Sequence, residues 1–449
     1  MLASHVDIRP HIPGEISRLE RVVVHRPGAE LDAVLPDNIA PHRVFEDGTL
    51  QKNTDYLLYD DLVLLPLLQK EHDELVRVLA AAAAPGGIIS VGRWLRTVLY
   101  KDPGRSAVID AAIAADAAQF GWTLAPETVW RIRDMEPDHL ARVLISGTDP
   151  ATGQRIFKWP SPNLMFVRDI AAVIGDSVVL SYAREPARQR EISMMREVLR
   201  HHPGFSDIHI IDVLPENNDP LSDDIALEGG DVLVLSAEVI VIGVGIRTTL
   251  TGAYRLARRL FEQRAQVVYV VELPRRRAAM HLDTVFTQIS ETECLAYLPV
   301  VAPSTGALDE QCKITRWTPE DHAPYLKPMG VSLLTALAQD GFALDPVPCG
   351  GTNPIQQARE QWSDGSNAFA LAPGKIVVYE RNQCTLEALN ARGYQILSTQ
   401  EFVQNASLFL AEAKRKFAVT ISGAELSRGR GGPRCLTFPL NRTPAIRAG

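Results

Sequence analysis

The sequence lacks the features that mark membrane, secreted and nucleic-acid-binding proteins. No run of about 18 apolar residues occurs, since the strongest apolar stretch, residues 232–246, contains Glu238, so no membrane-spanning helix is expected. The N-terminus has no basic segment followed by an apolar one, as a secretory signal would have. The net charge of −8 argues against general binding to nucleic acid.

Cysteine is also scarce. The five cysteines, at positions 294, 312, 349, 384 and 435, are widely spaced, form no CxxC pair and are odd in number. Such a set is a poor basis for a disulfide framework and suits a reducing cytosol. We therefore expect a cytoplasmic protein with no membrane and no nucleic-acid partner.

The 449 residues, 46% of them hydrophobic, are enough for one large domain or for two to three ordinary ones. A β-rich run over residues 19–28 ends in a Pro-Gly turn. Residues 53–79 carry apolar side chains at helical spacing, with a break or kink expected at Pro66. Residues 76–150 show helical patterns between Pro-Gly turns and no chemical motif, so we expect an all-helical unit there.

A strand–turn–strand–helix unit recurs after Pro160. Hairpins are predicted over residues 170–182, 231–243, 284–298 and 368–379, with helices over 185–200, 251–264 and 385–391. A further strand, such as residues 267–271, often follows the helix, and the N-terminal strand completed by the C-terminal segment makes a fifth unit. Recurrence at a period above about 50 residues favours a repeated architecture. The expected fold class is α/β, a five-bladed propeller of ββαβ repeats.

Polar side chains stand at the front of each repeat. They are Asn163 and Asp169, Glu228 and Asp231, His281 and Asp283, Asn367, and finally Cys435. Singly, each has an ordinary explanation, such as a surface ion pair for Asp169 or a hydrogen-bonded core histidine for His281. Equivalent positions in a ring of repeats face a common axis, so their recurrence predicts one shared site.

A glycine-rich loop precedes the last cysteine. Between Ser427 and Cys435 stand three glycines, one proline and three arginines, a composition typical of a shaped loop. We expect the arginines to favour the thiolate of Cys435, which is the nucleophilic form. The alternative, a basic surface loop with an incidental cysteine, is disfavoured by the acidic residues and the histidine upstream.

In combination these motifs resemble the arginine deiminase family of guanidino-group-modifying enzymes. The matching stretches are residues 162–169, 228–231, 281–284 and 429–435, with further likeness at 24–28 and 58–61. The resemblance extends from about residue 13 to residue 442. It implies a five-bladed α/β propeller, which we assign to residues 1–75 and 151–449, with an all-helical domain inserted at 76–150.

The resemblance implies hydrolysis of the guanidinium group of L-arginine to L-citrulline and ammonia. Paired carboxylates would hold the N–H groups and fix the plane of the cationic carbon, a role that we assign to Asp169 and Asp283. Cys435 would attack that carbon and form a covalent thiouronium intermediate. His281, oriented by Glu228, would protonate the departing ammonia and then activate water.

The resemblance also implies donors for the α-carboxylate of the substrate, namely Asn163, Arg188 and Arg247. Arg430, next to Gly429 on the cysteine loop, is expected to help close the site. Asp231 is expected to support Glu228 from behind.

Two positions depart from the family pattern. Val167 stands where the family usually has threonine, and Ile246, after Gly245, stands where it usually has glutamate. Because these positions flank the region expected to recognise the carboxylate, a hydrolase of a different guanidino compound stays an alternative.

Three further alternatives belong to other classes. An amidinotransferase would use the same cysteine and histidine with an amine acceptor in place of water. A metal-dependent hydrolase would bind a cation through Asp169, Glu228, Asp231, His281 and Asp283. An inactive guanidine-binding protein is disfavoured by the presence of both Cys435 and His281. We expect a hydrolase without metal or organic cofactor, whose partner is a small guanidino substrate and whose chains form a homo-oligomer.

Overall fold

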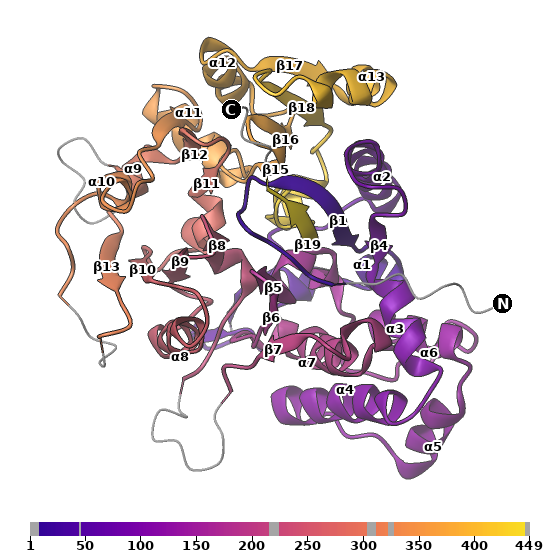
Figure 1. The fold of residues 1–449 in the computed structure, drawn as a ribbon. Coiled ribbons are helices and arrows are strands. Elements are labelled where there is room, and N and C mark those ends of the chain that lie inside the picture. The colour runs from indigo at the N-terminus through magenta and orange to yellow at the C-terminus, as the bar shows by residue number, and fades with distance from the viewer. Residues whose placement is uncertain (1–8, 45, 215–223, 303–310, 322–326, 445–449) are drawn as a thin grey trace.

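Five sheets surround a common centre, and most helices lie outside them (Figure 1). The structure is a computed structural model that describes residues 9–44, 46–214, 224–302, 311–321 and 327–444. The first sheet joins the two ends of the chain, because β1 (Arg18–Val24) pairs antiparallel with β19 (Phe438–Thr443). On its other side β1 pairs parallel with β4 (Ile88–Ser90).

The other four large sheets follow one another along the chain. The second contains β5 (Ala171–Ile174), β6 (Ser177–Leu180) and β7 (His209–Ile211), and the third contains β8 (Val232–Val234), β9 (Val239–Val244), β10 (Val267–Glu272) and β13 (Lys313–Trp317). The fourth contains β11 (Phe286–Gln288), β12 (Glu293–Ala296) and β14 (Asp345–Pro348), and the fifth contains β15 (Phe369–Ala372), β16 (Lys375–Tyr379), β17 (Gln395–Ser398) and β18 (Phe417–Ile421). A separate hairpin joins β2 (His42–Val44) to β3 (Leu50–Lys52).

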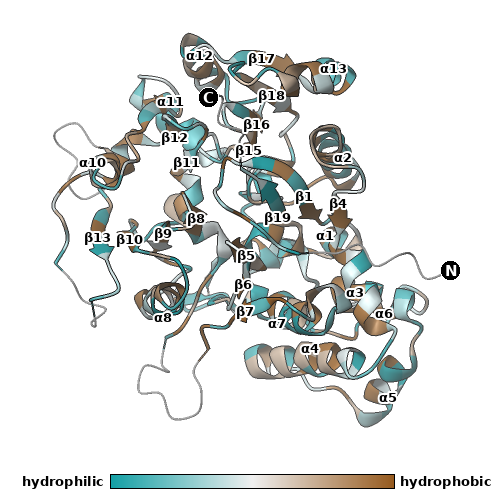
Figure 2. Ribbon diagram, viewed as in Figure 1, coloured by the Kyte–Doolittle hydropathy of each residue, from teal (hydrophilic) through white to brown (hydrophobic). Residues whose placement is uncertain are grey.

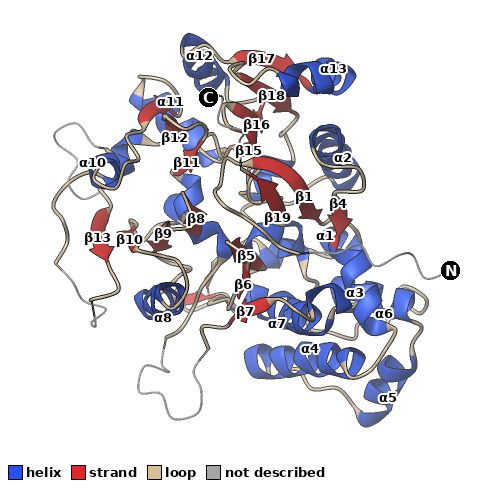
Figure 3. Ribbon diagram, in the orientation of Figure 1, coloured by secondary structure: helices blue, strands red, loops and turns tan. Residues whose placement is uncertain are grey.

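The predicted hairpin repeat is confirmed in these four sheets. In each, the first two strands pair antiparallel and the next partner of the second strand runs parallel to it, as β7 does with β6 and β10 with β9. A parallel neighbour requires a crossover connection, usually a helix. The crossovers contain α7 (Pro186–His201), α8 (Leu250–Phe261) and α12 (Gln383–Ala391), which agree with the predicted helices within a few residues. Figure 3 shows the inner strands and the outer helices separately coloured.

The predicted helix over residues 53–79 is wrong in its first part. The helix α2 (Leu65–Ala82) begins one residue before Pro66. Proline is tolerated in the first helical turn because its missing N–H would have no partner there. Pro66 therefore marks the start of the helix and not a kink within it, and residues 53–64 contain no helix.

Residues 76–150 are not all helical. They include the end of α2 and then β4, which completes the first sheet beside β1. The apolar run Ile88-Ile89 is short and β-branched, which favours a strand. After β4 come α3 (Val91–Leu99), α4 (Gly104–Phe120), α5 (Pro126–Asp134) and α6 (Pro137–Ser146). The remaining helices are α1 (Ala29–Asp32), α9 (Leu298–Val301), α10 (Leu333–Ala338), α11 (Pro354–Trp362) and α13 (Thr399–Ala411).

These helices share their core with the second sheet. One apolar cluster contains Trp94 of α3, Val108 of α4 and Leu144 of α6 together with Val179 of β6 and Leu199 of α7. Hydrophobic colour accordingly continues from the strands into the helices that cover them (Figure 2). In the part of the chain that the structure describes, no helix combines the length and the apolar character needed to cross a membrane.

Short 3₁₀ turns lead into the inner strands and carry the polar residues. They are η3 (Val167–Asp169) before β5, η5 (Gly229–Asp231) before β8 and η7 (Leu282–Thr284) before β11. These turns pack against one another at the centre. At Gly229 a Cβ atom would lie 2.1 Å from the carbonyl oxygen of Arg168, so only glycine allows this approach.

We predict that Gly229→Ala lowers the free energy of unfolding by about 1–3 kcal/mol or more, because a rigid backbone oxygen would have to move. Chemical denaturation followed by circular dichroism measures this loss. Gly92→Ala is the matched control, since its Cβ would meet nothing closer than an Arg96 nitrogen at 3.7 Å, within helix α3. An unchanged midpoint in Gly229→Ala would show that the turns are not held by this contact.

Candidate active site

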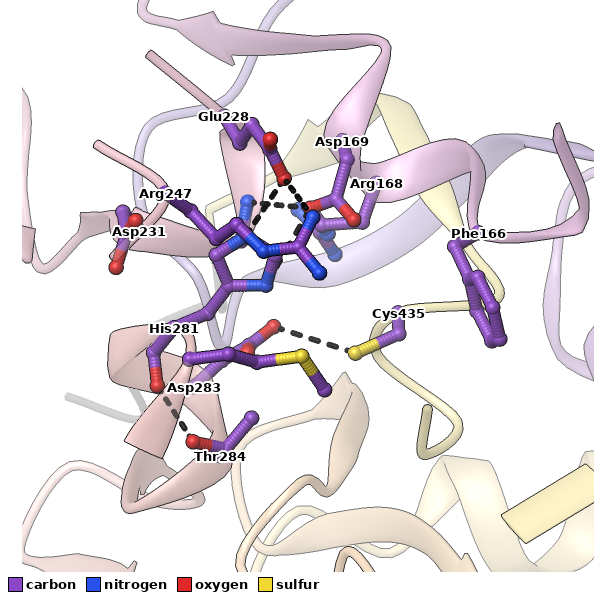
Figure 4. Close-up of polar contacts among 12 residues, drawn as sticks. Phe166, Arg168, Asp169, Glu228, Asp231, Arg247, His281, Asp283, Thr284 and Cys435 are labelled. Atoms are coloured by element: carbon purple, nitrogen blue, oxygen red, sulfur yellow. Dashed lines mark hydrogen bonds and ion pairs between the residues drawn. The ribbon is translucent and has the colours of Figure 1, made fainter. Parts of the chain in front are cut away.

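A small pocket, with a cavity volume of about 20 Å³, lies where the turns meet. Figure 4 shows Cys435, His281, Asp283, Asp169 and Glu228 converging from loops that are far apart in the sequence. The described residues that line the pocket are Leu58, Asn163, Phe166, Asp169, Arg188, Arg247, Arg277, Met280, His281, Gly429, Arg430 and Cys435. The structure thus brings together the polar residues of successive repeats.

His281 and Glu228 form a buried pair. The imidazole Nε2 lies 2.9 Å from Glu228 Oε2, and its Nδ1 lies 3.8 Å from Asp169 Oδ1. Burial alone would lower the pKa of His281, but the charge of Asp169 and the hydrogen bond with Glu228 outweigh it and raise this pKa to about 9. The imidazole is therefore protonated at neutral pH and donates a hydrogen bond to Glu228.

Glu228 stays ionised in spite of complete burial. Desolvation raises its pKa, but Arg247, His281 and Arg188 together lower it below its ordinary value. Arg247 Nη1 lies 3.5 Å and Arg188 Nη1 lies 3.6 Å from Glu228 Oε2. One carboxylate thus orients the histidine and holds two arginines at the pocket wall.

Arg188 is engaged by acidic residues of the chain itself. It pairs with Asp169 through a short hydrogen bond, and its Nε donates to Glu191 Oε1 at 2.7 Å. Its Nη2 donates to the carbonyl oxygens of Asn163 and Phe166 at 3.1 and 3.3 Å. Asp169 has little free capacity, since its Oδ1 also accepts the N–H of Gly230 at 3.0 Å.

Cys435 lines the pocket, and its nearest charged group among the contacts of its thiol is the acid Asp283. Its Sγ is 3.7 Å from Asp283 Oδ2 and 3.3 Å from the side-chain nitrogen of Asn367. Burial first, and then the charges of Asp283 and Asp169, raise the pKa of the Cys435 thiol well above its ordinary value. Our expectation that the loop arginines favour the thiolate is therefore wrong.

The three loop arginines are directed elsewhere. Arg428 pairs with Asp61 and with Glu425 near the surface. Arg434 is fully buried and donates to Asp283 Oδ2 at 2.7 Å, so it neutralises the acid beside the thiol and not the thiol itself. Arg430 stacks on Trp362, with its guanidinium carbon 3.6 Å from the ring centre.

Several buried polar atoms at or near the pocket have no hydrogen-bond partner among the described residues. They include the three guanidinium nitrogens of Arg430, Asp283 Oδ1, Glu228 Oε1 and both carboxylate oxygens of Asp364. Buried polar groups normally find partners. The Arg430 nitrogens, in the pocket lining, and Asp283 Oδ1, on the acid beside Cys435, are therefore candidates for contact with a ligand.

The remaining predicted residues differ in their positions. Gly429 lines the pocket, where its absent side chain leaves room against Phe166. Asn163 also lines it, but its side-chain nitrogen donates to the carbonyl oxygen of Leu57 at 2.9 Å. Asp231 does not line it, because its Oδ1 accepts the N–H of Leu282 at 2.9 Å. Asp231 therefore holds the turn that carries His281 and Asp283, where we expected it to support Glu228.

Sequence reasoning gave no role to several lining residues. Leu58, Phe166, Arg277 and Met280 contribute pocket walls, and Asn367 binds the cysteine loop through its side chain, accepting the N–H groups of Arg434 and Cys435 at 2.9 and 3.2 Å. Leu58 and Phe166 lie in the matched family stretches, and Asn367 opens a repeat. The sequence therefore contained an indication that each of these three residues belongs to the site. For Arg277 and Met280 we find none.

The two departures from the family pattern do not line the pocket. Val167 is fully buried in the apolar cluster beneath the second sheet, and Ile246 is half-buried. A valine in place of threonine suits this apolar environment, since a buried hydroxyl would need a hydrogen-bond partner.

Asp169, Glu228 and His281 are close enough to share one cation, since one ligand atom from each lies within 4.8 Å of the others. The same groups are already paired with each other and with Arg188 and Arg247. Asp283 is paired with Arg434. A divalent ion would have to displace buried arginines, so the arrangement suits an ion-paired acid–base site better than a metal centre.

Comparison with known proteins shows the family of this chain. A sequence model described as "ADI: Arginine deiminase" matches residues 148–442. The chain belongs to the arginine deiminase family. Proteins named arginine deiminase from Mycobacterium tuberculosis (strain H37Rv) and Bacillus thuringiensis subsp. konkukian are 34% and 30% identical to it, and each alignment covers 96% of this chain and 98% of the relative.

The same fold occurs in solved structures. The amidinotransferase SxtG of Microseira wollei, from the saxitoxin biosynthetic pathway, superposes with a TM-score of 0.52 at 13% identity, covering 98% of this chain and 99% of that one. The chain thus has a mixed α/β fold similar to that of an amidinotransferase.

We predict that Glu228→Gln lowers the pKa of His281 from about 9 by roughly 1–3, because the histidine loses a charged hydrogen-bond partner. Histidine-labelled protein titrated by NMR measures it, with the resonance assigned by its loss in His281→Asn. His139→Gln is the control, since His139 pairs with Asp149 outside the pocket and its loss should leave the His281 titration in place. An unchanged titration in Glu228→Gln would contradict the pairing.

Proposed function

We propose that this chain hydrolyses the guanidinium group of L-arginine to L-citrulline and ammonia. One observation carries the proposal: Cys435 lies beside Asp283 and shares one pocket with the His281–Glu228 pair, in a chain of the arginine deiminase family. A nucleophile, a proton carrier and carboxylates around one pocket suit attack on a cationic carbon.

The guanidinium end of the substrate would bind between acidic residues. Asp283 Oδ1 has no partner and is free to accept a substrate N–H, while Oδ2 stays with Arg434. Asp169 would accept a second N–H once Arg188 yields part of its contact. Two carboxylates on one planar cation fix its orientation for attack from the face.

Binding of the substrate would itself convert the Cys435 thiol into the nucleophilic thiolate. The charges that raise the pKa of Cys435 belong to Asp283, Asp169 and Asp364. A bound guanidinium offsets these charges, so the thiolate becomes accessible when the carbon that it attacks is in place. The thiol would therefore react poorly with other electrophiles until the pocket is filled.

His281 would carry protons in both halves of the reaction. Protonated at neutral pH, it donates to the leaving nitrogen, and ammonia departs from the tetrahedral adduct to leave a thiouronium on Cys435. The neutral imidazole then takes a proton from water, which attacks the same carbon. Collapse of that adduct breaks the carbon–sulfur bond, forms the ureido carbonyl and restores the cysteine.

The α-carboxylate of arginine would bind at the opposite end of the pocket. Arg430 has three nitrogens without a hydrogen-bond partner, and Arg247 is paired with Glu228 alone, at 3.5 Å, within the part of the chain that the structure describes. Arg188 is already held by three acids, whose charges raise its pKa against the effect of burial. We therefore expect Arg430 to make the main contact with the α-carboxylate and Arg247 to make the second. Arg188 and Asn163 would have a supporting role.

We extend the proposal to the architecture. The five sheets would be blades of a five-bladed α/β propeller, with α3–α6 as the inserted helical segment. The five unpaired cysteines support a reducing cytoplasmic setting. A homo-oligomer stays an expectation that sedimentation analysis would test.

We predict that Cys435→Ser abolishes turnover, because a hydroxyl is far less ionised than a thiol at neutral pH. A chelator should leave wild-type activity unchanged, with one ammonia released per arginine consumed. Both are measured by ammonia and citrulline assays. Activity that survives in Cys435→Ser and disappears with the chelator would support a metal mechanism instead. A new guanidino product without ammonia, in the presence of an amine, would support an amidinotransferase.

We predict that agmatine, which lacks the carboxylate, has a kcat/KM roughly 10- to 100-fold below that of arginine. Arg430→Gln should narrow this gap, because it loses the guanidinium that faces the carboxylate. Trp362→Leu is the matched variant, since it removes the ring beneath Arg430 and keeps the cation. Equal kcat/KM for both substrates on the wild type would defeat the assignment of free arginine.

A further inference from the structure

Glu15 lies in the segment before β1 and reaches the centre of the molecule. Its N–H donates to the carbonyl oxygen of Val234, at the end of β8, at 2.6 Å, and its side chain is buried. It does not line the pocket. Its carboxylate nevertheless takes part in the charge arrangement around Cys435, through a residue 419 positions away.

A chain of two ion pairs connects Glu15 to the reacting groups. Arg434 Nε donates to Glu15 Oε1 at 2.8 Å, and Arg434 Nη1 donates to Asp283 Oδ2 at 2.7 Å. Arg434 Nη2 donates to the carbonyl oxygen of Val232 at 2.8 Å. All three guanidinium nitrogens of Arg434 are thus used, and its planar group is fixed in position and rotation.

The geometry decides which oxygen of Asp283 is left for a ligand. Oδ2 faces Arg434 and lies 3.7 Å from Cys435 Sγ, while Oδ1 has no partner. If Arg434 rotated, it could cover the other oxygen or leave both exposed to the thiol. Glu15 opposes this rotation together with the Val232 carbonyl, and of the two contacts only the one with Glu15 is also an ion pair.

Glu15 also balances an excess of buried positive charge. Arg168 Nη2 lies 3.8 Å from Glu15 Oε1. Burial, and next the neighbouring charge of Arg434, lower the pKa of Arg168 to about 9. Burial raises the pKa of Glu15, but Arg434 and Arg168 lower it to about 2, so the carboxylate is ionised at any working pH. An unpaired buried arginine would draw Asp283 towards itself.

We propose that Glu15 is a positioning residue for the reaction: through Arg434 it holds Asp283 so that one carboxylate oxygen stays free for the substrate beside Cys435. The proposal rests on the proposed hydrolysis of a guanidinium group. It gives a role in catalysis to a residue that never touches the substrate, in a segment outside the stretches that carry the family motifs.

Glu15→Gln tests the proposal, since it keeps the shape of the side chain and removes its charge. We expect kcat/KM for arginine to fall roughly 10- to 100-fold, the effect of a misplaced contact to the reacting group. We also expect Cys435 in the ligand-free protein to be alkylated by iodoacetamide at lower pH than in the wild type. The groups that face this thiol are Asp283, Asp169 and Asp364, and Arg434 would then offset Asp283 more completely.

Glu293→Gln is the matched control. Glu293 is a buried acid that pairs with Lys416 at 2.9 Å and accepts a hydrogen bond from Tyr394 at 2.9 Å, and it does not line the pocket. We expect it to lower the thermal midpoint while kcat/KM and the alkylation profile stay as in the wild type. If Glu15→Gln lowers only the thermal midpoint, as the control does, the role of Glu15 is structural and the proposal is overturned.

Glu15→Asp separates the effect of the charge from the effect of the side-chain length. It keeps the carboxylate, so the alkylation profile should stay close to the wild type, while the shorter side chain lowers kcat/KM severalfold. If Glu15→Gln does not fold, Glu15→Asp decides alone, and a wild-type kcat/KM in it overturns the proposal. A folded Glu15→Gln with wild-type kcat/KM and alkylation profile overturns it as well. If the wild type does not consume arginine, the proposed function fails, and the alkylation profiles still test the link from Glu15 to Cys435.

Discussion

Buried acidic side chains at the centre of the five sheets impose the constraint on which the site depends. Charges removed from water are costly unless they are paired, and the chain supplies the partners itself. Arg188 compensates Asp169 and Glu191, Arg247 approaches Glu228, and Arg434 bridges Glu15 and Asp283. Asp169 and Asp283 lie on the inner turns, while Arg188 and Glu191 come from α7 and Glu15 from the segment before β1. The sheets and their crossovers thus hold a balanced set of charges at the centre.

This balance explains why a cation is the natural ligand. Burial first, and then the charges of Asp283, Asp169 and Asp364, raise the pKa of the Cys435 thiol and keep it protonated at neutral pH. A neutral ligand would not change that. A guanidinium would, and Arg188, which is itself a guanidinium on Asp169, is an example of that contact within the chain. Under the proposed reaction, substrate binding and activation of the nucleophile would be one electrostatic event.

Much of the fold was predictable because its signals are local. Short β-branched runs joined by tight turns indicate the hairpins at 170–182 and 231–243, and several of the polar residues predicted to meet line one pocket. The errors have equally local causes. Pro66 was interpreted as a kink because apolar spacing continued on both sides of it, and β4 was missed because three residues give too short a pattern.

The charge partners within the site were beyond the reach of the sequence. Nothing near Glu15 indicates that it meets Arg434, because the contact joins the two ends of the chain and depends on β1 and β19 lying side by side. Asp231 was expected behind Glu228 because the two are neighbours in sequence, but its carboxylate turns to the N–H of Leu282. The arginines near Cys435 show the same limit, because their positions in the sequence do not indicate which acidic residue each one contacts in the fold.

The pocket combines groups of both charges, and a ligand has to suit both. Asp283 Oδ1 has no hydrogen-bond partner, and acids surround Cys435. The guanidinium of Arg430, stacked on Trp362, has no hydrogen-bond partner either. A small molecule with a guanidinium at one end and a carboxylate at the other offers a cation to the acids and an acceptor to Arg430. Val167 and Ile246 do not line the pocket, so their departure from the family pattern changes neither requirement.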